Sequence, residues 1–187
     1  MTRLQRLVFL AIFLFLPFLC FAQSAAPTGS VTIFYTFSRL FRIASNQYAI
    51  WIEDEQGSFV RTLTATSFVS KRAGWKIRKQ AVPVWVKAAG IPGLPQKDVD
   101  AVSSPTPRSG AYKVVWDLKD SKGKAVAAGT YRYLVEGNIS WDNEVLWTGT
   151  ILIGGAARSS TAAATYSPAD AQRSGVLISG VSAAYTP

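Results

Sequence analysis

Two pairs of carboxylates are placed so that they could do acid–base chemistry, Asp117 with Glu136 and Asp142 with Glu144. A hydrolase that works through two carboxylates needs them about 5 to 9 Å apart around a cleft. Side-chain alternation points Asp117 away from its apolar neighbours, and Asp142 and Glu144 lie in a predicted turn, so neither pair indicates a cleft. The sequence therefore predicts no enzyme, and a carboxylate-dependent hydrolase stays an alternative function.

Other groups with catalytic or metal-binding chemistry are scarce. The chain contains no histidine, and Cys20 is its only cysteine. If Cys20 is lost with the N-terminal leader described next, the mature chain can hold no disulfide, thiolate nucleophile, Cys/His metal site or Ser-His-Asp triad. The composition thus excludes several enzyme classes and predicts no metal site.

Residues 1–22 have the layout of a cleaved secretory signal peptide. Arg3 and Arg6 precede an apolar run over residues 7–19, which is shorter than the about 20 residues that a transmembrane helix needs. We predict cleavage after Ala22 and a periplasmic mature protein, with a retained membrane anchor as the alternative. Loss of the two arginines would leave 18 basic and 11 acidic residues, a net charge of +7.

A basic segment interrupts the strand pattern between residues 67 and 110. Its first half mixes cations with tryptophans, and such a mixture can contact anionic lipid headgroups, an acidic partner or a phosphate-bearing cofactor. Nucleic acid is not expected as a partner of an exported protein. Alternatively, the tryptophans pack on the main fold and the cations are only solvated. The candidate partner-binding residues are Lys71, Arg72, Trp75, Lys76, Arg78, Lys79 and Trp85.

A β-rich fold must position these candidates, because most of the chain alternates apolar and polar residues with the period of a strand. The segment Tyr112–Tyr133 is expected to form a central hairpin, with glycine and the Asp120 side chain shaping its turns. Two further hairpins are expected over residues 47–66 and 130–153. A short helix is expected at residues 81–89, since Pro83 suits the first turn of a helix.

The region 23–187 is therefore predicted to be a single domain. Its fold class is all-β, an antiparallel immunoglobulin-like β-sandwich of about seven or eight strands with one inserted loop and short-helix segment. The insertion covers residues 67–110 and is expected to continue as an irregular, proline-rich loop from residue 90. Residues 154–171, rich in Ala, Ser and Thr, are predicted to be a loop, and residues 176–185 a last strand.

Two families resemble the sequence. The segments Trp116–Tyr133 and Ile50–Leu63 resemble the immunoglobulin-like domain of the flagellar hook-capping protein. Nearly the whole mature chain is similar to a family of predicted periplasmic proteins, domain of unknown function family 2271. That resemblance implies an exported single-domain protein without an assigned activity, with membrane proteins of the PepSY type and periplasmic flavin transferases as candidate partners. It rests on residues 44–54, Val84–Trp85, Asp100–Val102, Ser109–Gly110, Trp116–Asp117 and Trp141–Glu144.

The implied flavin transferase singles out one loop. Covalent FMN attachment sites resemble Asp-x-x-Ser/Thr-Gly-Ala-Thr/Ser, in which the last hydroxyl takes the flavin phosphate. The chain keeps Asp100, Ser103 and Thr106 at matching spacing, but Ser104-Pro105 replaces Gly-Ala. Pro105 fixes φ where glycine would allow close approach to the backbone. The resemblance thus implies an alternative function, a flavin-bearing electron carrier with its phosphate near Arg108, Lys76 or Arg78.

The leading hypothesis is a non-catalytic, exported binding or accessory module without a cofactor. It would act within an extracytoplasmic redox or metal-uptake system. The export signal, the expected sandwich and the lack of catalytic residue types support this hypothesis, and the basic insertion is its candidate contact surface.

Overall fold

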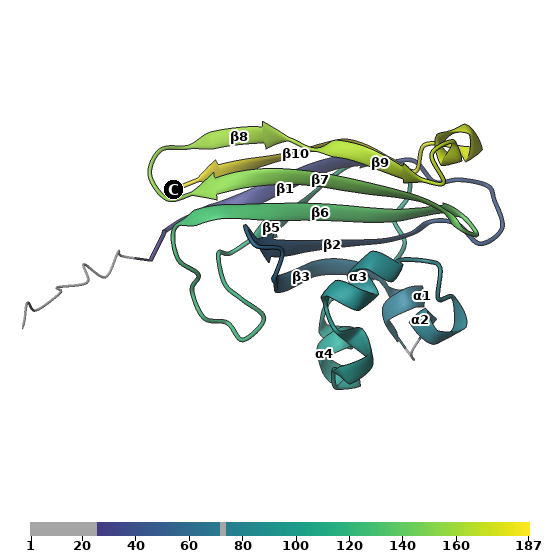
Figure 1. The fold of residues 1–187 in the computed structure, drawn as a ribbon, viewed down its shortest axis with the longest axis horizontal. Coiled ribbons are helices and arrows are strands. Elements are labelled where there is room, and N and C mark those ends of the chain that lie inside the picture. Colours follow the sequence, from purple (N-terminus) through teal and green to yellow (C-terminus); the bar gives the residue numbers. More distant parts are fainter. Residues whose placement is uncertain (1–25, 72–73) are drawn as a thin grey trace, which may run out of the picture.

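The computed structural model describes residues 26–71 and 74–187, so the expected leader and Arg72 lie outside the described part. Two β-sheets pack face to face (Figure 1). The first sheet, sheet A, has the strand order β5-β1-β10-β8, and the second, sheet B, has the order β4-β3-β2-β6-β7-β9. All pairs are antiparallel except β3 with β4. The predicted all-β sandwich is thereby confirmed.

The described residues contain ten strands, more than the sequence predicted. Both terminal strands of the described region, β1 and β10, pair with each other inside sheet A. The strands are β1 Ser30–Phe37, β2 Gln47–Asp54, β3 Phe59–Thr66, β4 Ser103–Ser104, β5 Gly110–Trp116, β6 Gly129–Ser140, β7 Asn143–Ile153, β8 Arg158–Thr161, β9 Ala163–Ser167 and β10 Ile178–Thr186.

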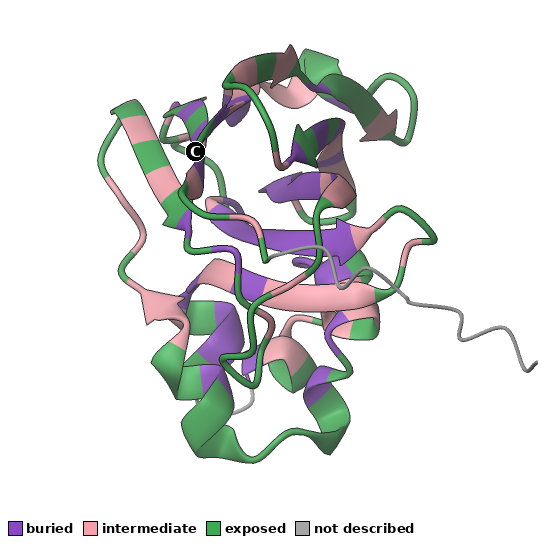
Figure 2. Ribbon diagram, turned by 90° about the vertical axis from the view of Figure 1, so that its left-hand side faces the viewer, coloured by how far each residue is buried: buried purple, intermediate pink, exposed green. Residues whose placement is uncertain are grey.

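The main hydrophobic core lies between the two sheets. Every second residue of β1 points into it, so that Ile33 and Phe37 are fully buried while Phe34 remains 42 % exposed. The core-facing side of β6 contributes Tyr131, Tyr133 and Val135 in the same way. Figure 2 shows buried residues along the strands and exposed ones around the outside.

Two of the three expected hairpins are confirmed, and the central one is wrong. β2 pairs with β3, and β6 pairs with β7, as predicted. In contrast, β5 pairs with β1 in sheet A, while β6 pairs with β2 and β7 in sheet B. The segment Tyr112–Tyr133 therefore crosses from one sheet to the other. Twelve residues separate the two strands, which leaves enough chain to span the sandwich.

The turn chemistry inside this crossover is as predicted. The Asp120 carboxylate accepts the backbone N–H groups of Lys122 and Lys124, both at 2.9 Å, and Gly123 adopts a φ of +79°. These hydrogen bonds, above all the one from Lys124, lower the pKa of Asp120.

The prediction of a loop at residues 154–171 is also wrong, because this segment contains β8 and β9. β8 is an edge strand of sheet A and β9 an edge strand of sheet B, so each needs only one partner and little apolar surface. Ser, Thr and Ala suffice there, which is why composition did not reveal these strands. The last strand expected at residues 176–185 is confirmed as β10, which pairs with both β1 and β8.

The insertion over residues 67–110 forms a helical layer on the outer face of sheet B (Figure 1). The expected helix is confirmed as α3, and the part from residue 90 is more regular than predicted. The layer contains α1 Ser67–Ser70, α2 Gly74–Ile77, α3 Pro83–Ala88, the 3₁₀ turn η2 Ile91–Gly93, α4 Gln96–Ala101 and strand β4. A further 3₁₀ turn, η3 Ala171–Ser174, precedes β10.

A second hydrophobic core joins this layer to the sandwich. Trp51 of β2, Leu134 of β6 and Trp85 of α3 are all buried in it. Consequently β2 is buried on both faces, and only its last residue, Asp54, is partly exposed. The helical layer supplies the cover for the second face.

A close approach across the β6–β7 pair yields a test of the main core. Gly149 lies opposite Tyr133, whose ring crosses the space above it, so that an added Cβ would sit 2.2 Å from the ring carbon Cζ. Gly149→Ala should therefore displace Tyr133 and lower the free energy of unfolding by about 1–3 kcal/mol, measured by urea denaturation. Gly93→Ala is the matched control, because its Cβ would meet no atom within 4 Å. Equal stability of the two variants would contradict this packing.

Candidate functional site

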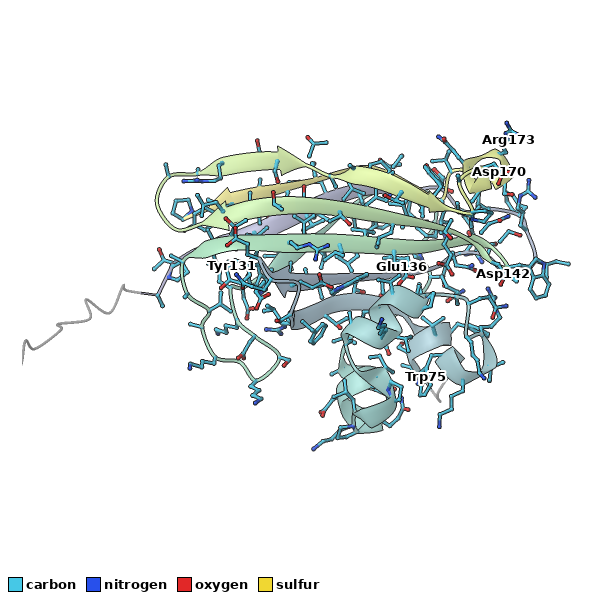
Figure 3. All side chains as sticks on the ribbon, viewed as in Figure 1. Trp75, Tyr131, Glu136, Asp142, Asp170 and Arg173 are labelled. Atoms are coloured by element: carbon cyan, nitrogen blue, oxygen red, sulfur yellow. The ribbon has the colours of Figure 1, made fainter. Side chains whose placement is uncertain are left out.

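Glu136 attaches the helical layer to the sandwich. It lies on the outer side of β6, between this strand and α3 (Figure 3), and none of its surface is exposed. Its carboxylate accepts the backbone N–H groups of Val84 at 3.0 Å and Trp85 at 2.8 Å. Since Pro83 opens α3 and has no N–H, Glu136 satisfies the next two donors of the helix. A side chain from the sheet thereby caps a helix of the insertion.

Burial changes the proton affinity of this group. The pKa of Glu136 is raised to about 8, mainly because burial removes the group from water. The two N–H bonds oppose this shift, and the charge of nearby Glu144 adds a smaller increase. Burial likewise raises the pKa of Glu144 to about 7, with a contribution from Asp142. Near neutral pH, Glu136 is therefore mostly protonated in the folded protein.

Trp85 belongs to the second core and not to a binding surface. Its side chain is fully buried, and its indole N–H donates to the hydroxyl of Thr62 at 2.9 Å. The prediction that Trp85 binds a partner is therefore wrong. Its side chain packs on the main fold, which was the alternative interpretation of the tryptophans in this segment. Removing it would expose the core that fixes α3 on the sheet.

Arg78 makes a second attachment. Its guanidinium donates from Nη2 to the carbonyl of Ala44 at 2.8 Å and to Oδ1 of Asn138 at 2.6 Å. The side chain also lies over the ring of Trp141, 6.0 Å from the ring centre, and its burial lowers the pKa. Arg78 thus joins the insertion to β6 and to the loop before β2, so its charge is already engaged.

Four further predicted candidates lie in the described part of the insertion, and Arg72 lies outside the described residues. Lys71, Lys76 and Lys79 are exposed, and Trp75 is half-buried, with the Lys76 ammonium 5.2 Å from its ring centre. Figure 3 shows Trp75 on the side of the helical layer away from the sandwich. These residues are free to contact a partner.

Trp75 and Lys79 open onto a cavity of about 540 Å³. Its other walls come from α3 and the η2 turn, and it is lined by Trp75, Lys79, Pro83, Val86, Lys87, Gly90, Pro92 and Gly93. The lining is mainly apolar and includes two lysines, Lys79 and Lys87. Lys87 was missed as a candidate, although its spacing of four residues from Pro83 places both on one face of a short helix.

A second cavity of about 420 Å³ lies between the edge of sheet B and α4. Phe59 and Arg61 of β3, Val99 of α4 and Lys122 of the crossover contribute to its walls. Residues from three separate segments meet there, so no local sequence pattern could have indicated it.

The three residues of the FMN-like motif occupy different kinds of structure. Asp100 lies in the last turn of α4, where its carboxylate accepts from the side-chain amide of Gln96 at 2.9 Å. Ser103 lies in β4, and its hydroxyl contacts Ser70 and the carbonyl of Val99. Thr106 follows in the irregular stretch before β5 and is half-buried. Attachment of FMN at Thr106 stays a prediction.

The two carboxylate pairs differ in their contacts. Asp117 forms an ion pair with Arg61 at 3.0 Å, whereas Glu136 binds the start of α3, so these two carboxylates have separate partners. Asp142 lies in the β6–β7 turn, as predicted, and is exposed. The prediction is wrong for Glu144, which lies in strand β7, pairs with Asn138 of β6 and is half-buried. Within residues 26–71 and 74–187, no group of three or more potential metal-binding side chains is found.

The raised pKa of Glu136 gives a pH-dependent stability. Between the ordinary value of 4.5 and about 8, the folded protein holds a proton that the unfolded chain releases. The free energy of unfolding should therefore fall as pH rises through this window, by up to about 1.4 kcal/mol per pH unit. Urea denaturation across this pH range measures the fall in the free energy of unfolding. Glu144, whose pKa is also raised, contributes to the fall. Glu136→Gln should make the fall smaller.

The matched control for this experiment is Glu55→Gln, an isosteric change in the exposed β2–β3 turn. It should keep the pH dependence of the wild-type protein. A Glu136→Gln variant whose stability declines with pH as steeply as the wild type would show that Glu136 does not bind a proton on folding.

Comparison of the sequence with known proteins shows to which family the chain belongs. A family model described as "Predicted periplasmic protein (DUF2271)" matches residues 32–167, from β1 through β9, and so includes the whole insertion. No significant match was found among curated proteins or among solved structures. Among the described helices, none is long and apolar enough to cross a membrane. The chain belongs to the DUF2271 family of predicted periplasmic proteins.

Proposed function

We propose that this protein is a non-catalytic periplasmic binding module whose helical insertion contacts an anionic segment of a partner protein. Its role would be that of an accessory component in an extracytoplasmic redox or metal-uptake system. The partner class is the one implied by the family resemblance, an inner-membrane protein of the PepSY type or a flavin transferase. The sandwich carries the insertion and would have an immunoglobulin-like arrangement.

The observation that supports this proposal is the cavity beside Trp75. It combines an apolar lining with the ammonium groups of Lys79 and Lys87, and so could hold an apolar side chain next to a carboxylate. Helix α3, which forms one wall, is attached to the sheet, because Glu136 caps it and Trp85 is buried in the second core. A preformed cavity of this kind lowers the ordering cost of binding.

Site-specific photocrosslinking in the periplasm tests the proposal. A photoreactive side chain at position 79 or 87 should give an adduct with one partner protein, identified by mass spectrometry. The matched control is position 113, since Lys113 is an exposed lysine on sheet A, away from the helical layer. Failure to obtain any adduct beyond those of the control position would contradict partner binding at the insertion.

Charge reversal provides the second measurement. Lys79→Glu with Lys87→Glu should abolish the adduct formed from position 76, because an anionic segment would then meet two carboxylates. Lys113→Glu with Lys124→Glu introduces the same change in net charge elsewhere and should leave the adduct intact. Loss of the adduct in both double variants would indicate general electrostatic attraction and not recognition at the cavity.

A flavin-bearing electron carrier is the second candidate function, favoured by the position of Thr106 outside the regular strands. Protein purified from a periplasm that contains the flavin transferase should then absorb visible light and carry the mass of one FMN. Thr106→Ala should lose both signals, while Thr64→Ala, a control on β3, should keep them. A colourless wild-type protein of unmodified mass would exclude this function.

A further inference from the structure

One end of the sandwich carries large apolar side chains that are unusually exposed. Phe41 is 100 % exposed, Ile43 and Ile77 are each 77 % exposed, and Trp141 is 53 % exposed. We call these four residues the apolar tip. They come from the β1–β2 loop, from α2 and from the β6–β7 turn, which lie at the same end of the molecule (Figure 1). Scattered single apolar residues are common on protein surfaces, but four gathered at one end indicate a contact surface.

The three segments of the tip are held together by hydrogen bonds. The carbonyl of Ala44 accepts the backbone N–H of Trp141 at 3.0 Å and the Arg78 guanidinium at 2.8 Å. Within the β1–β2 loop, the Asn46 side chain bonds both the N–H and the carbonyl of Leu40, each at 2.7 Å. Phe41 and Ile43 are therefore displayed by a braced loop, with Trp141 and Ile77 fixed beside them through Arg78.

Cations outnumber anions around the tip. Arg39 and Arg42 are exposed on the same loop as Phe41, and Lys76 is exposed next to Ile77. Figure 3 shows Arg173, Asp170 and Asp142 at this end of the molecule, and Glu144 lies two residues after Asp142, so acidic residues are present as well. The surroundings of the tip remain net positive, in agreement with the basic composition of the whole chain. A phosphate-rich surface is complementary to this charge.

The shape of the tip favours a lipid surface over a protein partner. Phe41 projects completely into solvent from a loop end, whereas protein partners are usually bound by flat or concave patches. Phenylalanine and isoleucine can enter the acyl boundary, tryptophan prefers the headgroup level, and arginine can reach phosphates beside them. We propose that the apolar tip inserts into the surface of an anionic phospholipid membrane, which goes beyond the binding of a protein partner at the insertion.

Vesicle sedimentation tests this proposal with protein purified from the periplasm. The wild-type protein should bind vesicles of equimolar phosphatidylglycerol and phosphatidylethanolamine at low ionic strength, and vesicles of phosphatidylcholine more weakly. Phe41→Ser with Ile43→Ser should weaken binding about tenfold or more, because both apolar insertions are lost. Both side chains are exposed, so unchanged thermal unfolding of the variant should show that the fold is kept.

The matched apolar control is Val115→Ser with Leu152→Ser, which removes two exposed apolar side chains from strands β5 and β7. This variant should bind like the wild type. Arg39→Gln with Arg42→Gln should weaken binding by about fivefold per arginine, and Lys113→Gln with Lys124→Gln should not. These paired variants separate insertion at the tip from general attraction of a basic protein.

Three results would overturn the proposal. The first is a wild-type protein that does not bind the anionic vesicles, which would leave the tip to a protein partner. The second is equal binding by the tip variant and the Val115/Leu152 control. The third is equal weakening by the two pairs of charge variants, which would indicate nonspecific electrostatic attraction.

Discussion

The hydrogen bonding of the buried Glu136 carboxylate is the interaction on which the position of the insertion depends. A carboxyl group without any contact to water is costly unless other groups replace its hydration, and the first free N–H groups of α3 do so. Those N–H groups would equally lack partners at the buried start of a helix that opens with proline. The carboxylate on the sheet and the N–H groups of the helix therefore satisfy each other's hydrogen bonding. On the same side of β6, Leu134 packs in the second core and Asn138 accepts from Arg78, so three alternate residues of one strand hold the insertion.

This arrangement makes the insertion a structural layer of the fold, with β2 and the neighbouring part of β6 between two cores. The residues proposed for partner binding lie on the surface of that layer, and those proposed for lipid binding lie at one end of the molecule. The separation has a functional consequence. Side chains such as Lys79, Lys87 and Phe41 can vary with the partner, while Glu136, Trp85 and Arg78 keep the surface in place.

The candidate site was predictable only in part, because the type of a residue does not show whether its side chain points into the fold or toward solvent. The basic-aromatic segment was found from its composition, yet Trp85 is fully buried and Trp75 opens onto a cavity. Arg78 and Lys79 are adjacent cations, but only Arg78 is engaged by the sandwich. Alternation places Glu136 on the outer face of β6, where a charged residue is ordinarily solvated, and only the helix above it explains its burial. The apolar tip was missed because its residues are separated by long stretches of chain.

The sequence by itself determined the β-rich class, the β2–β3 and β6–β7 hairpins, the Asp120 turn, the start of α3 at Pro83 and the last strand. These features depend on neighbouring residues, through side-chain alternation and local hydrogen bonds. The tertiary structure decided that β5 and β6 join different sheets, that Ser, Thr and Ala form the edge strands β8 and β9, and that the insertion buries the second face of β2. Such features depend on which distant segments pack together. An alternating pattern predicts which side chains share a face of a strand, but it does not predict which segment packs on that face.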